Sequence, residues 1–287
     1  MISALLVIPR WYEHEAQGAF IANVSYALPT SAVQFYPNMR FAELPISYSI
    51  SEACNARKRD DIRVALAELE QTTPLAFVER GEGSISYACS HVELPSGQTN
   101  HFVAGEAVPT RIVNASAFYI IEGANVSLYR DELCDTPQVA LHETLHALGF
   151  DHTSNETSIM FPITQCDQTL DTSIIETLVQ LYAIPSYPDL VLVSLSANVS
   201  SGYLSFESTL ANRGLVDTTG FSLVLRGKDF EKTFTLSLLP YGKATLLSAS
   251  HIPFPRSVVN LSFSIVYDGP ELSYENNGAT ILFKENA

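Results

Sequence analysis

The segment His142–His152 constrains this chain more than any other, because it reads H-E-x-x-H-x-x-G-x-x-H. On a helix, His142 and His146 are four residues apart and project from one face, so both imidazoles can reach a single metal ion. Gly149 lets the chain leave the helix and turn back, which brings His152 within reach as a third ligand. The spacing therefore predicts a metal centre at the end of a helix.

The same residue types also predict the chemistry of that centre. Three neutral imidazoles leave a fourth coordination position for water, as in catalytic zinc sites, whereas a structural site would be closed by protein groups. Zinc lowers the pKa of its bound water, and Glu143 stands beside the ligands without being one, so it is the predicted general base and acid. We expect a hydrolase with one catalytic Zn²⁺ ion.

Apolar periodicity places the motif on a capped helix and predicts the elements around it. Thr136 can cap this helix, Pro137 suits its first position, and Gly149 can end it. Upstream, Ile46–Ile50 alternates like a half-buried strand, and residues 55–71 have the apolar stripe of an amphipathic helix. Further strands are expected at Leu75–Glu79, Ser84–Ala88, Arg111–Asn114 and Asn125–Tyr129. A last helix should begin at Asp171 or Thr172, with an apolar side of Ile174, Ile175, Leu178, Val179 and Leu181.

Length and composition favour two folded domains. The chain has 287 residues and is 46% hydrophobic, which is enough for two cores. Ile184–Pro188 contains two prolines and can neither continue a helix nor enter a central strand, so we place a boundary there. About seven short apolar runs follow without helical periodicity, which is typical of a β-sandwich. We expect a leader at residues 1–40, a zinc-binding domain at 41–184 and a sandwich at 189–287.

The charge of the chain excludes one class of partner. Asp and Glu outnumber Lys and Arg by 31 to 16, which gives a formal net charge of −15. Residues 1–184 hold 22 acidic and 9 basic side chains, and the remainder holds 9 and 7. Binding along a nucleic-acid backbone needs a basic surface, so no nucleic-acid partner is expected.

The cysteines indicate an oxidising compartment. Cys54, Cys89, Cys134 and Cys166 form no C-x-x-C pair, which argues against a four-thiolate zinc site and favours two disulfides. Six glycosylation sequons point the same way, at Asn23, Asn114, Asn125, Asn155, Asn198 and Asn260. We therefore expect an extracellular or cell-surface protein.

The N-terminal apolar run Ala4–Ile8 does not form an intact export signal. It follows no basic residue, and a membrane span would need about 20 apolar residues. The run fits the remnant of a truncated signal or anchor, or equally a short strand or a disordered leader.

The extended motif, followed by Ser158-Ile159-Met160-Phe161-Pro162, resembles the metzincin zinc endopeptidases, whose motif precedes a methionine turn. The layout of residues 41–184 is most similar to the matrixins. Pro45–Tyr48, residues 55–71 and Thr73–Phe77 resemble the opening strand, helix and second strand, and Leu178–Tyr182 resembles the end of the last helix. This implies an α+β domain with a mixed twisted sheet and about three helices, and Met160 as an apolar floor beneath the ligands.

The resemblance also implies that the substrates are proteins or peptides. Asn125–Tyr129 precedes the zinc helix where the family has its edge strand over the cleft, so its backbone would pair with an extended substrate. Two features of the family are not seen in this sequence. One is the propeptide cysteine motif. The other is the acidic and histidine-rich loop that binds structural metals, because His91 and His101 are isolated here.

A bridge between Cys134 and Cys166 would hold both ends of the segment that contains the motif and the methionine turn. We predict this disulfide and, by elimination, Cys54–Cys89.

Residues 189–285 resemble the CARDB family of immunoglobulin-like domains in prokaryotic surface proteins. The resemblance rests on Asp189-Leu190-Val191, on Leu210-Ala211-Asn212-Arg213-Gly214 and on Tyr274-Glu275-Asn276-Asn277. It implies a spacer, or a module that docks a cell-surface or matrix partner; the alternative is another Greek-key sandwich of unassigned role. For the whole chain, the alternative to an endopeptidase is a surface adhesion or binding protein with a vestigial zinc site.

Overall fold

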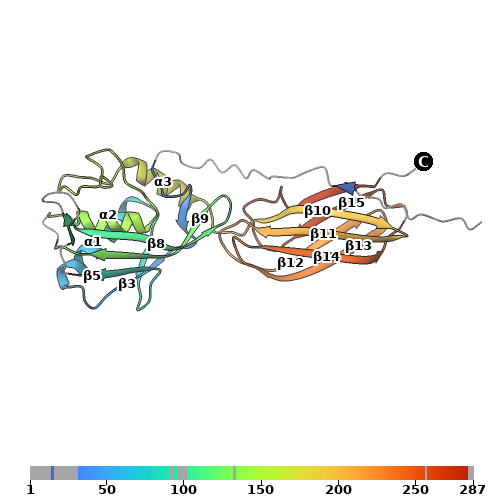
Figure 1. The fold of residues 1–287 in the computed structure, drawn as a ribbon, viewed down its shortest axis with the longest axis horizontal. Helices are drawn as coiled ribbons and strands as arrows, with labels where there is room; N and C mark the ends of the chain where they lie inside the picture. Colours follow the sequence, from blue (N-terminus) through green and yellow to red (C-terminus); the bar gives the residue numbers. More distant parts are fainter. Residues whose placement is uncertain are drawn as a thin grey trace, which may run out of the picture. The chain divides into compact units, whose positions relative to one another are not determined.

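The computed structural model describes residues 14–15, 32–90, 94–95, 102–131, 134–255 and 257–283. It divides into two compact units, which we call the helical unit, Ser25–Ser186, and the β unit, which runs from Tyr187 and includes β1, His14–Glu15. All three helices of the described chain belong to the helical unit (Figure 1). None of the described helices is long and apolar enough to cross a membrane.

The helical unit is built on a mixed sheet with the strand order β2-β9-β5-β3-β4, to which β8 is added along the other side of β9. Only β8 runs antiparallel to its neighbour. The strands are β2 Met39–Phe41, β3 Ile46–Ile50, β4 Phe77–Glu79, β5 Ile85–Cys89, β8 Gly105–Asn114 and β9 Tyr119–Leu128. A separate pair joins β6, Leu94–Pro95, to β7, Phe102–Val103.

The three helices are α1 Ala56–Thr72, α2 Gln138–Ala147 and α3 Thr172–Ala183. The amphipathic helix predicted over residues 55–71 is confirmed as α1. Asn55 caps it, because its side-chain oxygen accepts a hydrogen bond from the Lys58 backbone N–H at 2.9 Å. Its buried stripe contains Ile62, Ala65, Leu66 and Leu69.

Two details of the predicted helices are wrong. Pro137 is the N-cap residue of α2, and the Thr136 hydroxyl accepts from the side-chain amide of Gln138 at 2.9 Å instead of capping the backbone. On α3, Val179 is 43% exposed, because the buried face passes through Ile174, Leu178 and Leu181.

The predicted edge strand is also wrong. Asn125–Tyr129 falls at the end of β9, whose backbone already pairs with β5 on one side and β8 on the other. A turn at Ala115–Phe118 folds β8 back along β9, and among the described residues no other strand pairs with β8. The edge is therefore β8, because the antiparallel hairpin places the earlier segment on the outside.

The helical unit begins earlier than the boundary predicted at residue 41. Residues 32–40 lie in this unit, where β2 pairs with β9. Arg40 is 2% exposed, donates to the carbonyls of Leu181 and Ile184 at the end of α3, and stacks over the Tyr182 ring at 4.4 Å. The apolar run Ala4–Ile8 lies outside the described residues.

The β unit contains two four-stranded antiparallel sheets, ordered β1-β10-β11-β14 and β13-β12-β15-β16. Phe206 of the first sheet meets Phe234 and Phe263 of the second, with ring centroids 5.2 and 5.4 Å apart, so the sheets share one core. The strands are β10 Leu190–Ser200, β11 Tyr203–Asn212, β12 Thr218–Gly227, β13 Phe230–Leu239, β14 Ala244–Pro253, β15 Asn260–Val266 and β16 Gly278–Leu282.

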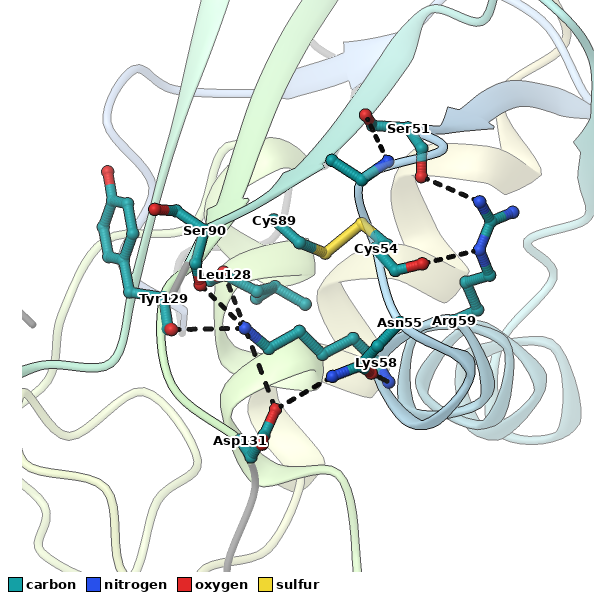
Figure 2. The surroundings of a disulfide bond; sticks show 11 residues. Ser51, Cys54, Asn55, Lys58, Arg59, Cys89, Ser90, Leu128, Tyr129 and Asp131 are labelled. Atoms are coloured by element: carbon teal, nitrogen blue, oxygen red, sulfur yellow. Dashed lines mark hydrogen bonds and ion pairs between the residues drawn. A yellow bond between two sulfur atoms is a disulfide. The ribbon is translucent and has the colours of Figure 1, made fainter. Parts of the chain in front are cut away.

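Two disulfides, Cys54–Cys89 and Cys134–Cys166, match the pairs predicted from the sequence. Beside the first of them, the ammonium of Lys58 is buried and donates to three backbone carbonyls (Figure 2). These belong to Ser90, Leu128 and Tyr129, at 2.9, 3.3 and 3.2 Å. Lys58 thus ties α1 to the ends of β5 and β9, from which the chain continues toward α2.

Lys58→Met should lower the free energy of unfolding of the helical unit by about 3 kcal/mol, because three carbonyls in a partly or fully buried position lose the hydrogen bond from a charged donor. Calorimetric unfolding of the full chain measures the change. Arg57→Met is the matched control, since Arg57 is exposed on the same helix and should unfold like the unaltered chain. Equal midpoints for both variants would contradict the structural role of the Lys58 ammonium.

Candidate metal centre

Helix α2 positions three of the predicted site residues. His142, Glu143 and His146 lie on it, and each is at most 7% exposed. Thr144 of the same helix shares a buried hydrogen bond of 2.9 Å with the hydroxyl of Tyr87 on β5. The two histidines are therefore presented from a helix fixed against the central sheet.

The helix ends in the left-handed turn that the motif predicts. Gly149 has φ +97°, its N–H donates to the His146 carbonyl at 2.9 Å, and the Phe150 N–H donates to the Leu145 carbonyl at 3.0 Å. A Cβ atom at Gly149 would lie 2.8 Å from the Cβ of Met39. Both the backbone conformation and the lack of space thus require glycine, and the turn directs His152 back toward the helix.

The three predicted histidine ligands converge. The Nε2 atom of His152 lies 3.1 Å from that of His146 and 3.3 Å from that of His142. A tetrahedral zinc ion with bonds of about 2.0–2.1 Å separates its ligand nitrogens by about 3.3 Å, so the spacing fits this ion. His152 is exposed, which leaves one side of the cluster accessible from solvent.

Two backbone carbonyls orient the buried ligands. The Nδ1 atom of His142 lies 2.6 Å from the Ile159 carbonyl, and that of His146 lies 2.7 Å from the Phe150 carbonyl. A carbonyl can only accept, so each Nδ1 bears the proton and each Nε2 directs its lone pair to the centre. Burial, with the neighbouring His146, lowers the pKa of His142 to about 4, and burial also lowers the pKa of His146. Both rings are therefore neutral, as metal ligands must be.

Glu143 is buried beside the ligands and is incompletely paired. Its Oε2 atom has no hydrogen-bond partner among the described residues. Burial, reinforced by the charge of Glu106, raises the pKa of Glu143 to about 8. Gly105 of β8 packs against it so closely that a Cβ there would lie 2.7 Å from the Glu143 Cγ. A buried carboxylate oxygen without a protein partner is suited to bind and exchange a proton with water.

Met160 is 1% exposed in the core of the helical unit, on the turn whose Ile159 carbonyl holds His142. Sequence reasoning missed the carbonyls of Ile159 and Phe150, because backbone groups give no residue signal. It also missed Gly105, since a glycine required by packing looks like any other. His91 and His101 lie outside the described residues.

Comparisons with known proteins show which family the helical unit is similar to. The matrixin family model matches residues 40–183. Matrix metalloproteinase-C of Caenorhabditis elegans is 26% identical in an alignment of 170 residues, which covers 53% of this chain and 28% of that protein. The chain thus spans little more than a quarter of the length of this relative.

A solved structure, the CARDB domain of a Pyrococcus furiosus protein in complex with di-metal ions, covers 33% of this chain and 84% of its own. The two are 16% identical with a TM-score of 0.27, which is too low to establish a shared fold.

Gly149→Ala should destabilise the helical unit and reduce the zinc that the protein retains, because it adds backbone strain and a clash with Met39. Gly202→Ala separates the two effects: Gly202 has φ +81° but nothing within 4 Å of an added Cβ. Calorimetry should show a larger loss of stability in Gly149→Ala than in Gly202→Ala. Zinc analysis should show a loss of zinc in Gly149→Ala alone. Equal losses of stability, with zinc retained by both variants, would contradict the close packing at the turn.

Proposed function

Because the chain belongs to the matrixin family, we propose that it is a zinc-dependent endopeptidase. The observation that carries the proposal is the convergence of three imidazole Nε2 atoms beside a buried carboxylate, one oxygen of which has no partner among the residues that the structure describes. The donor set fits zinc, since three neutral histidines leave one position for water. His142, His146 and His152 would hold the ion.

Bound zinc would lower the pKa of its water, polarise the scissile carbonyl and, through its positive charge, favour the ionised form of Glu143 that can act as a base. The chain itself supplies the proton transfer. Glu143 accepts a proton from the attacking water at its free carboxylate oxygen and then donates it to the leaving amine. Its buried position beside Gly105 limits the rotamers available to the carboxylate, which keeps the base near the reacting atoms.

The substrate backbone would bind along β8. Among the described residues this strand pairs only with β9, and its first residue, Gly105, abuts Glu143. An extended peptide can add to such an edge through main-chain hydrogen bonds, whatever its side chains. In this arrangement the scissile bond passes directly in front of the base, and the peptide pairs with β8 rather than with Asn125–Tyr129.

The proposal also includes where the enzyme acts and what role the β unit has. Two disulfides are typical of proteins that fold outside the reducing cytosol, so we place the enzyme in the extracellular space or on the cell surface. The two packed sheets of the β unit are consistent with an immunoglobulin-like, CARDB-type sandwich. We assign it the role of a spacer or of a docking module for a surface or matrix partner.

Glu143→Gln should retain zinc and lose at least about 100-fold in peptide cleavage, because the amide cannot accept the proton. Zinc-loaded protein is incubated with a diverse peptide library, with and without chelator, and cut sites are read by mass spectrometry. Cleavage unchanged by Glu143→Gln would disprove the role of Glu143. Zinc binding by the unaltered protein without any cleavage would favour a surface binding protein with a vestigial site.

Gly105→Ala should also retain zinc, while kcat/KM falls by about 10- to 100-fold, because the added Cβ pushes the base out of place. Gly81→Ala is the control, since an added Cβ there meets nothing within 4 Å. Steady-state kinetics on one library-derived peptide compares the two. Normal activity of Gly105→Ala would show that Glu143 does not depend on this contact.

A further inference from the structure

A short segment upstream of the first sheet strand lies across the metal-binding turn. We call Val33–Phe35 the strap. The Phe35 N–H donates to the Gly149 carbonyl at 2.9 Å, and the Asp151 N–H donates to the Val33 carbonyl at 3.0 Å. Gln34 and Phe150 form the antiparallel bridge between these bonds. The strap thus pairs with the residues that connect the second ligand to the third.

Through this pairing the strap reaches the ligand His146 in two ways. Its partner Phe150 provides the carbonyl that accepts from the His146 Nδ1. In addition, the Phe35 ring stacks on the His146 imidazole, with centroids 5.7 Å apart and planes 21° from parallel. The imidazole is therefore restrained by a hydrogen bond at its edge and by an aromatic ring against its face.

The strap is anchored at points away from the histidines. The side-chain amide of Gln34 bonds to both the backbone N–H and the carbonyl of Met39, at 3.2 and 2.9 Å. Next along the chain, the Tyr36 ring stacks on Tyr119 of β9 at 4.6 Å. Gln34 and the backbone pairing with the turn thus hold the strap, and the Tyr36 stack lies beyond it. Phe35 itself remains 37% exposed, so its ring contributes little to the core.

We propose that Phe35 is a positioning residue of the metal centre, which holds the His146 imidazole in its ligating orientation. The proposal rests on the zinc site proposed above. A ligand whose ring is fixed before the ion arrives loses less freedom on binding, so residues that orient ligands increase affinity although they never touch the metal. The strap precedes the residues that match the matrixin model, and the centre therefore extends beyond them.

The test uses full-length variants and two readouts other than activity. Phe35→Leu removes the ring but keeps an apolar side chain at a partly exposed position, so folding should persist. Zinc affinity is measured by competition with a chelator, and ligand geometry by the visible absorption spectrum of the Co²⁺-loaded protein. We expect Phe35→Leu to weaken zinc binding about 10-fold and to alter the cobalt spectrum. Phe35→Tyr, which keeps the ring, should match the unaltered protein in both.

Tyr36→Leu is the matched control, because it removes a ring that is one residue away and stacks on Tyr119 instead of on a histidine. It should leave both readouts unchanged. Thermal unfolding of the zinc-free proteins verifies that all variants fold. Unchanged affinity and spectrum in Phe35→Leu would overturn the proposal, as would an equal loss in Tyr36→Leu. If the unaltered protein bound no zinc, the proposed function itself would fail, and that result is distinct from either of these.

Discussion

The reversal of the chain at Gly149 is the constraint on which the rest of the site depends. The third histidine follows the second by six residues, so the backbone must leave α2 and return within one tight turn. Only a positive φ allows this, and the turn is packed so closely on Met39 that a methyl group would not fit. The strap pairs with this turn, Met39 of β2 packs against it, and the Phe150 carbonyl that orients His146 belongs to it.

The ligands are oriented mainly by backbone groups. His142 and His146 each donate to a carbonyl, one from the turn at Ile159 and one from Phe150. Such acceptors do not change rotamer, and both segments are themselves fixed. The Cys134–Cys166 bridge connects the approach to α2 with the chain beyond Ile159, and the strap pairs with Phe150. The geometry of the centre is thus a property of the folded helical unit rather than of three mobile side chains.

Lys58 and Glu143 are two buried ionisable residues of this unit, and they differ in how the cost of burying a charge is offset. The Lys58 ammonium is surrounded by three carbonyls, which offset the cost of its desolvation and make it a structural tie. Glu143 is buried to a similar degree, but within the described part of the chain one of its oxygens has no hydrogen-bond partner. A fold tolerates such an unpaired group where function requires it, and the unsatisfied carboxylate accordingly lies beside the three histidines.

The sequence by itself determined the parts of this protein that are local. The spacing from His142 to His152 specified a shared helix face and a glycine turn, the apolar stripe specified α1, and the four cysteines led to the correct pairs. Tertiary structure decided what depends on segments distant in sequence. It placed β8 rather than Asn125–Tyr129 at the sheet edge, assigned residues 32–40 to the helical unit, and set Phe35 against His146. The physical reason is that periodicity and spacing describe neighbours along one element, whereas strand order and contacts with backbone carbonyls arise only when separate elements pack together.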